Sequence, residues 1–176
     1  MYMWRKLDKA KNMRINEIGT GQGKENQKLK RGSANGEKLR VGIAVAEFNP
    51  DITEKLLEGA LKTLVEAGVQ RKHLMVVHVP GSFELPLACQ RLAKSDRYDA
   101  LIALGCVIKG ETDHYYYVAG EASRGIMEVM LKYDIHIGFG VITANNLKQA
   151  EERSGKINIG ANAARAVLAL NATRLS

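Results

Sequence analysis

LIALGCV, residues 101–107, followed by IKGETDH, residues 108–114, is the stretch of sequence that decides the fold. Its first seven residues are almost all apolar, which is typical of a strand that is buried on both faces. A helical repeat over about residues 113–131 begins directly after the turn Lys109-Gly110-Glu111-Thr112. A buried strand that leads through a short turn into a helix is the repeating unit of parallel α/β proteins.

The same unit recurs along the chain. Apolar segments predict four strands, at residues 39–46, 73–79, 98–106 and 135–143. Helical spacing of apolar residues predicts helices after each strand, with Asp51 or Thr53 as the cap of the first and two helices at the end. This order predicts an α/β three-layer sandwich, in which helices flank a central four-stranded parallel sheet, of the flavodoxin-like type.

The positive charge of the chain lies at its beginning. The whole sequence has 26 Lys and Arg against 19 Asp and Glu, and residues 1–40 hold 11 and 4 of these. We therefore expect a basic, disordered extension over residues 1–38 and a neutral domain over residues 39–176. A neutral domain offers no basic surface to nucleic acid, so we expect no nucleic-acid partner. No apolar run approaches the ~20 residues of a membrane helix, and no signal peptide is evident, so we expect a cytoplasmic protein without a membrane partner.

The sequence indicates neither a metal nor a cofactor. Its two cysteines and four histidines form no ligand motif, and no G-x-G-x-x-G follows the first strand. Cys89 and Cys106 are expected to be buried, and three of the histidines, His73, His78 and His136, to be structural.

Ligands of such folds bind beyond the carboxyl ends of the strands. Phe48 follows the first strand and is either a lid over the core or a platform for a flat heterocycle. Ser82 follows the second strand and either caps a helix or, with Glu84, binds the hydroxyls of a polyol. Arg153 forms either a surface ion pair with a neighbouring glutamate or a clamp on a phosphate.

The turn before the long helix suggests an anion site. Gly110, Thr112 and His114 come together at a helix N-terminus, whose first amides have no partners within the helix. The helix dipole favours a neutral imidazole there, and such a group takes up a proton and later returns it. The turn therefore predicts acid–base chemistry on a phosphorylated small molecule.

Four motifs, in this order, resemble those of the 6,7-dimethyl-8-ribityllumazine synthase family, which belongs to riboflavin biosynthesis. They are Glu47-Phe48-Asn49, residues 79–86 (VPGSFELP), residues 104–125 (LGCVIKGETDHYYYVAGEASRG), and residues 138–143 (GFGVIT) with residues 149–153 (QAEER). The resemblance covers about residues 39–170.

The resemblance implies a transferase without a cofactor. It would condense 5-amino-6-(D-ribitylamino)uracil with 3,4-dihydroxy-2-butanone 4-phosphate, with release of phosphate and water. It also implies a homo-oligomer, at least a pentamer, with active sites at subunit interfaces, and functional coupling to riboflavin synthase.

The resemblance also assigns roles to residues of this chain. His114 would carry protons, and Phe139 would come from the neighbouring subunit. The ribitylaminouracil would be bound by Phe48, Asn49, Ser82, Phe83, Glu84, Cys106, Val107, Ile108 and Phe139. The phosphate would be bound by Gly110, Glu111, Thr112 and Arg153.

The sequence departs from the family pattern after Arg153. Ile159 and Asn162 stand where lysine and glutamate are usual, and the preceding loop is short, which weakens the expectation of an icosahedral shell. Lys109 replaces a common arginine, and Tyr115-Tyr116 replaces a more usual Phe-acidic pair. The changes at Ile159 and Asn162 motivate an alternative, a weakly active or inactive paralogue that binds lumazine or flavin. A further alternative is a scaffold whose basic extension binds a polyanion.

Overall fold

The computed structural model describes residues 38–172. The predicted basic extension lies outside the described residues except for Lys38. The strands are β1 (Val41–Ala46), β2 (Leu74–Val79), β3 (Ala100–Ile108) and β4 (His136–Ala144). The helices are α2 (Pro50–Glu66), α3 (Leu85–Lys94), α4 (His114–Tyr133), α5 (Leu147–Ser154) and α6 (Ile159–Asn171), with short 3₁₀ turns η2 (Arg71–His73) and η3 (Ser82–Glu84).

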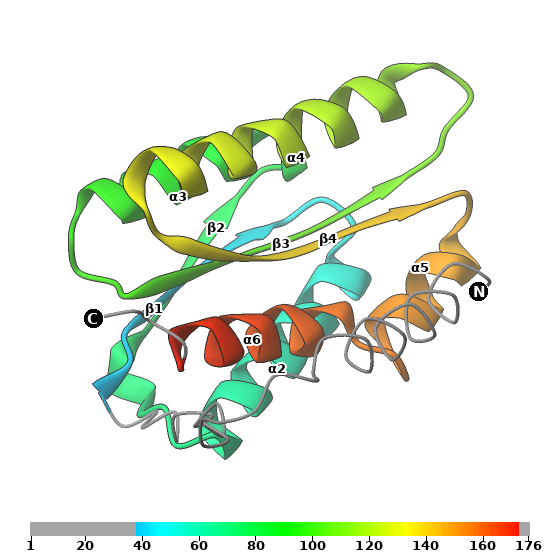
Figure 1. Ribbon diagram of the computed structural model, residues 1–176. Coiled ribbons are helices and arrows are strands. Elements are labelled where there is room, and N and C mark those ends of the chain that lie inside the picture. Colours follow the sequence, from blue (N-terminus) through cyan, green and yellow to red (C-terminus); the bar gives the residue numbers. More distant parts are fainter. Residues whose placement is uncertain (1–37, 173–176) are drawn as a thin grey trace, which may run out of the picture. The chain divides into compact units, whose positions relative to one another are not determined.

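The four strands form one parallel sheet in the order β2-β1-β3-β4. Helices α3 and α4 cover one face, and α2, α5 and α6 cover the other (Figure 1). The central strands β1 and β3 are buried at nearly every position, as their continuous apolar sequences predict. The predicted three-layer α/β sandwich of the flavodoxin-like type is confirmed.

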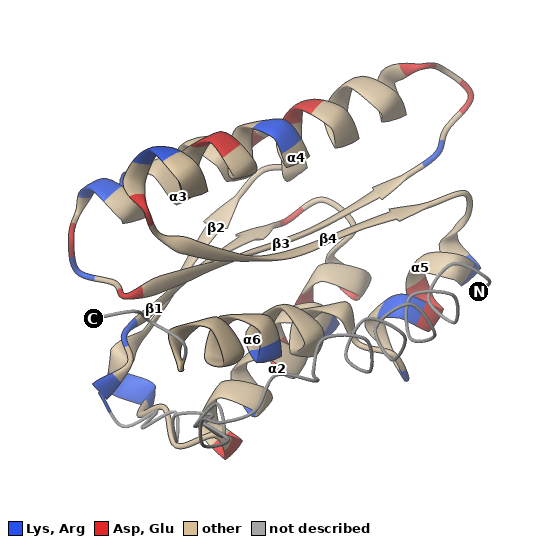
Figure 2. Ribbon diagram, viewed as in Figure 1, with Lys and Arg blue, Asp and Glu red and all other residues tan. Residues whose placement is uncertain are grey.

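Two apolar cores lie on the two sides of the sheet. One packs α2 and α6 against residues such as Ile43 and Ile102. The other packs α3 and α4 against residues such as Leu101 and Ala103. Charged residues lie mostly on the helices and connections (Figure 2), so the sheet presents polar groups mainly where its strands end.

The structure corrects one detail of the predicted helix starts. Asn49, and neither Asp51 nor Thr53, occupies the N-cap of α2, with a left-handed backbone at φ 62°. Pro50 follows as the first helical residue, a position that suits the fixed φ of proline. The chain therefore turns sharply between β1 and α2, directly after Phe48.

The third strand is longer than its sequence predicts at the carboxyl end. β3 runs to Ile108, whereas the apolar pattern placed its end at about residue 106. Val107 and Ile108 pair with Thr143 and Ala144 of β4, and this pairing carries the strand beyond its neighbour β1. The extension places the start of α4 beyond the end of β1.

Two kinds of feature are absent from the described part of the chain. None of its helices has the length and apolar character needed to span a membrane. In the same residues, no group of three or more His, Cys, Asp or Glu side chains is placed to bind a metal ion.

Candidate active site

A pocket of about 540 Å³ lies at the carboxyl ends of β1, β2 and β3 and at the start of α4. Parallel strands end at the same edge of a sheet, which brings these separate segments together. The lining residues are Phe48, Gly81, Ser82, Phe83, Glu84, Cys106, Val107, Ile108, Gly110, Thr112, His114, Tyr115, Tyr117 and Val118.

The aromatic rings of Phe48 and Phe83 stand at the rim of the pocket. Their exposed fractions are 69% and 56%, so Phe48 is no lid over the core, which was one of its two predicted roles. The backbone N–H of Phe48 donates to the carbonyl oxygen of Pro80 over 3.1 Å. This hydrogen bond fixes the segment after β1 beside the segment after β2, with a large apolar ring left free to stack on a flat ligand.

Ser82 offers a hydroxyl group with no protein partner. The residue is 4% exposed, and its Oγ is buried without a hydrogen bond to any residue that the structure describes. It does not cap α3, whose N-cap is Glu84. A β-carbon on Gly105 would lie 2.5 Å from this Oγ, so the glycine allows the serine to sit against the sheet. Because an unpaired buried hydroxyl is costly, this group is suited to a ligand.

The floor of the pocket is apolar and carries a protonated thiol. Cys106 and Val107 are buried at the end of β3. Burial raises the pKa of the Cys106 thiol to about 11, so the group is neutral at physiological pH. The floor is therefore suited to a flat neutral ring and offers no nucleophile.

The start of α4 supplies the polar end of the pocket. Gly110, Thr112 and His114 lie in or directly after the turn that joins β3 to α4. The N-cap residue Asp113 makes no side-chain hydrogen bond to the first turn. Amides that no side chain caps can bind an anion, and a β-carbon on Gly110 would meet nothing within 4 Å, so the turn is open on that side.

Four of the predicted site residues do not line the pocket of a single chain: Asn49, Glu111, Phe139 and Arg153. Asn49 instead donates from its side-chain amide to the carbonyl oxygen of Cys106. Arg153, on α5, donates to the carbonyl oxygen of Gln149 and takes part in neither of the ion pairs that the sequence suggested. Phe139 lies on the edge strand β4 and is 46% exposed.

The structure adds Gly81, Tyr115, Tyr117 and Val118 to the predicted lining. Tyr117 and Val118 follow His114 by three and four residues, so they share its face of α4. This spacing would have identified both from the sequence once His114 was placed in the first turn. The other three histidines, which were expected to be structural, do not line the pocket.

Comparison with known proteins identifies the family. The model of the 6,7-dimethyl-8-ribityllumazine synthase family matches residues 38–174. The chain belongs to this family. A 6,7-dimethyl-8-ribityllumazine synthase from Parabacteroides distasonis is 48% identical over 117 residues, which cover 66% of this chain and 73% of the relative. Another from Desulfovibrio desulfuricans is 42% identical over 139 residues, which cover 78% of this chain and 89% of the relative.

Membership of the lumazine synthase family confirms the resemblance drawn from the four motifs. It also confirms the predicted enzyme class, a transferase of riboflavin biosynthesis. The matched range takes in every residue that was predicted for the site. The roles of the individual residues stay predictions.

Proposed function

We propose that this chain condenses 5-amino-6-(D-ribitylamino)uracil with 3,4-dihydroxy-2-butanone 4-phosphate to form 6,7-dimethyl-8-ribityllumazine. The observation that carries the proposal is the meeting of Phe48, the unpaired Ser82 hydroxyl and His114 in one pocket. These groups match the three needs of the reaction, which are a stacking surface for the pyrimidine, a partner for the ribityl chain and a carrier of protons.

The ring of the first substrate would lie between Phe48 and the end of β3. Cys106, Val107 and Ile108 offer a flat apolar wall and backbone groups to a pyrimidine. The ribityl hydroxyls would then reach Ser82, Phe83 and Glu84, the segment after β2. The buried Ser82 Oγ gains its missing hydrogen bond in this arrangement, which favours a polyol over an apolar chain.

The phosphate of the second substrate would lie at the turn before α4. The open amides around Gly110 and the Thr112 hydroxyl are suited to its oxygens, and hydrogen bonds to a charged phosphate are about twice as strong as neutral ones. Binding there presents the ketone to the amine of the pyrimidine beside His114. We propose the backbone N–H of Glu111 as a further contact of this turn, made when the loop adjusts to the substrate.

The chemistry then needs orientation and proton transfer. The amine attacks the ketone and water leaves as the imine forms. Loss of a C–H proton then expels phosphate, and the resulting enol becomes a ketone. The ribityl-bearing nitrogen attacks this ketone, and a second water leaves as the ring closes. We propose that His114 takes a proton from the attacking amine and returns it to a leaving oxygen. Holding the two substrates together supplies much of the remaining acceleration. No step of this sequence requires a metal or a cofactor.

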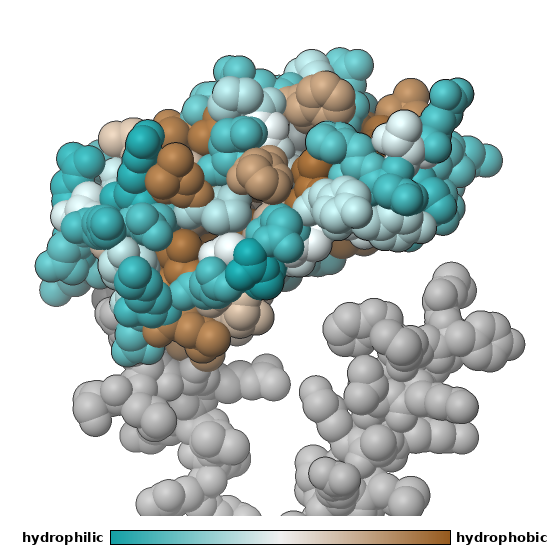
Figure 3. All heavy atoms as spheres, turned by 90° about the horizontal axis from the view of Figure 1, so that it is seen from above, coloured by the Kyte–Doolittle hydropathy of each residue, from teal (hydrophilic) through white to brown (hydrophobic). Residues whose placement is uncertain are grey.

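A second copy of the chain would complete the site. The pocket of one chain lacks Phe139 and Arg153, and both lie on elements that do not reach it. We propose that a neighbouring subunit brings the Phe139 ring against the pyrimidine and the Arg153 guanidinium against the phosphate. Exposed apolar side chains on the face formed by α3 and α4, including Leu87, Met127 and Leu131, support burial in an oligomer, which we propose to be a homopentamer (Figure 3).

Two broader expectations stay predictions, namely the cytoplasmic location and the functional coupling to riboflavin synthase. The alternative of a binding paralogue rests on Ile159 and Asn162. Ile159 packs against the core, and Asn162 accepts a hydrogen bond from Arg165, so neither residue provides a charge for a phosphate.

Measuring both turnover and lumazine binding distinguishes an active synthase from a paralogue that only binds its ligand. The full chain would be supplied with both substrates while lumazine absorbance is followed, with the uncatalysed rate subtracted. We expect product formation well above that rate. A folded oligomer that binds the lumazine yet forms none from the substrates would overturn the proposal in favour of the paralogue.

A further inference from the structure

The turn that carries the proposed phosphate site is closed by a contact between Lys109 and Tyr116. The Lys109 ammonium donates to the Tyr116 hydroxyl over 3.1 Å and lies 5.3 Å from the centre of its ring. The Lys109 backbone N–H donates to the carbonyl oxygen of Ala144 over 2.8 Å. Both ends of the turn, residue 109 and the first turn of α4, are therefore joined across the loop.

Tyr116 also connects this contact to the wall of the pocket. Its ring meets that of Tyr115 edge to face, with centres 5.2 Å apart and planes at 86°. Tyr115 lines the pocket, whereas Lys109 and Tyr116 do not. The lysine is thus held beside the phosphate turn, outside the volume that the substrates would occupy.

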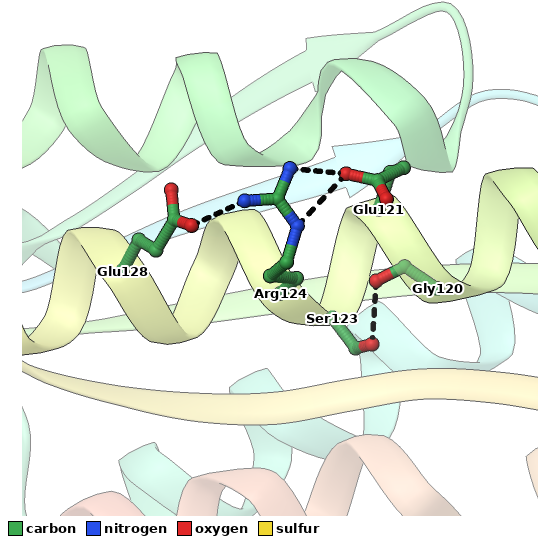
Figure 4. Close-up of polar contacts among 5 residues, drawn as sticks. All are labelled: Gly120, Glu121, Ser123, Arg124 and Glu128. Carbon is green, nitrogen blue, oxygen red and sulfur yellow. Dashed lines mark hydrogen bonds and ion pairs between the residues drawn. The ribbon is translucent and has the colours of Figure 1, made fainter.

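The partner of this lysine is a phenol and not a carboxylate. The hydrogen bond to Tyr116 raises the pKa of Lys109, and the charge of Asp113 adds a smaller effect in the same direction. Lys109 forms no ion pair with a carboxylate of residues 38–172. Arg124, further along α4, shows the contrast, because Glu121 and Glu128 both contact its guanidinium (Figure 4).

This difference determines which charge remains available to a ligand. Two carboxylates compensate the charge of Arg124, whereas a phenol fixes Lys109 without compensating it. Glu111 and Asp113 in the same turn would repel an anion, so a phosphate that approaches Gly110 and Thr112 needs a nearby cation.

We propose that Lys109, positioned by Tyr116, sets the affinity of the turn for the phosphate of the phosphorylated substrate. The inference rests on the proposed function and adds a residue to it. Tyr116 is a positioning residue, because it holds the lysine in place and leaves the charge of the lysine uncompensated. Lys109 is exposed to solvent, so its effect should be modest, about three- to fivefold, and should fall as salt screens it.

The test compares four variants of the full-length chain with the wild type. Lys109→Met removes the charge, and Lys109→Arg keeps it. Tyr116→Glu leaves the lysine in place but supplies a carboxylate partner. Arg124→Met is the matched control, since it removes a cation from the same helix that is already compensated. The measurements are the Kd of inorganic phosphate by calorimetry and the KM of each substrate, at low and high ionic strength.

We expect Lys109→Met and Tyr116→Glu to raise the phosphate Kd and the KM of the phosphorylated substrate about three- to fivefold at low salt. The kcat and the KM of the uncharged pyrimidine should change less than about twofold. Lys109→Arg and Arg124→Met should resemble the wild type.

An unchanged phosphate Kd in Lys109→Met would overturn the inference, as would an equal effect of Arg124→Met. An increase in the phosphate Kd that is as large at high salt as at low salt would also overturn the inference, because a structural role of Lys109 would then explain the increase. Calorimetry needs no turnover, so these outcomes can be read even if the chain makes no lumazine. A wild type without turnover would contradict the proposed function alone.

Discussion

The side-chain amide of Asn49 donates to the carbonyl oxygen of Cys106 over 3.1 Å and so joins the end of β1 to the end of β3. The same residue is the N-cap of α2 and has a left-handed backbone. One side chain therefore sets the distance between Phe48 and the floor of the pocket. This role differs from the direct substrate contact that the family resemblance implied for Asn49.

Two replacements of Asn49 should separate the energetic contribution of its hydrogen bond from that of its left-handed backbone. Asn49→Gly removes only the hydrogen bond and should lower the free energy of unfolding by about 1 kcal/mol. Asn49→Ala should cost about 1–2 kcal/mol more, because alanine also opposes a positive φ. Chemical denaturation measures both, and equal losses in the two variants would contradict this account of the backbone.

His114→Gln should lower kcat with little change in KM. Glutamine retains hydrogen-bonding capacity but transfers no proton, so we expect about a 100-fold loss, the lower end of the range for acid–base catalysis. Steady-state kinetics with the uncatalysed rate subtracted measures it. His78→Gln, at a histidine outside the pocket, is the control. If both variants kept wild-type turnover, His114 would not be the proton carrier.

Phe48→Ala should weaken binding without weakening the fold. The ring is 69% exposed, so its loss removes little buried area, but stacking on a flat ring is worth about 1–3 kcal/mol. We expect the Kd of the lumazine product to rise about tenfold, as measured by fluorescence titration, with the melting temperature unchanged. Ile157→Ala, at another exposed apolar residue, should leave the Kd as it is. A normal Kd in Phe48→Ala would argue against stacking.

The raised pKa of the buried Cys106 thiol should slow its alkylation at neutral pH. Only the thiolate reacts with iodoacetamide, and the pKa of about 11 keeps its fraction small at neutral pH. The rate should therefore keep rising about tenfold per pH unit through pH ~9, where an ordinary thiol levels off. Mass spectrometry follows the reaction, and Cys106→Ala reports the contribution of Cys89, whose pKa burial raises to about 12. A plateau near pH 8.5 would contradict the burial.

The sequence predicted the fold because its strands are continuous apolar runs that end in polar turns. The same logic located Phe48, Ser82 and His114, since each follows a strand end. It missed Tyr117 and Val118, although their spacing of three and four residues from His114 places them on the same face of α4, and it missed Tyr115, which has no such spacing. The cap of α2 was assigned to Asp51 or Thr53 because the left-handed turn at Asn49 leaves no trace in the apolar pattern.

Other predicted residues depend on more than one chain. Phe139 and Arg153 fit the family motifs, but in one chain they lie away from the pocket. Sequence pattern reports which residues share a face of an element. It does not report which copy of the chain contributes them to a site.

Subunit mixing tests the central claim most directly, that lumazine forms in this pocket and that a second copy completes it. His114→Ala would be refolded together with the double variant Phe139→Ala/Arg153→Ala, and turnover measured at limiting phosphorylated substrate. Random mixing of equal amounts leaves about a quarter of the interfaces with all three side chains intact. We predict recovery to about a quarter of wild-type turnover, from two nearly inactive parents. A mixture no more active than its parents would contradict the account, because the three residues would then act within one chain or at different sites.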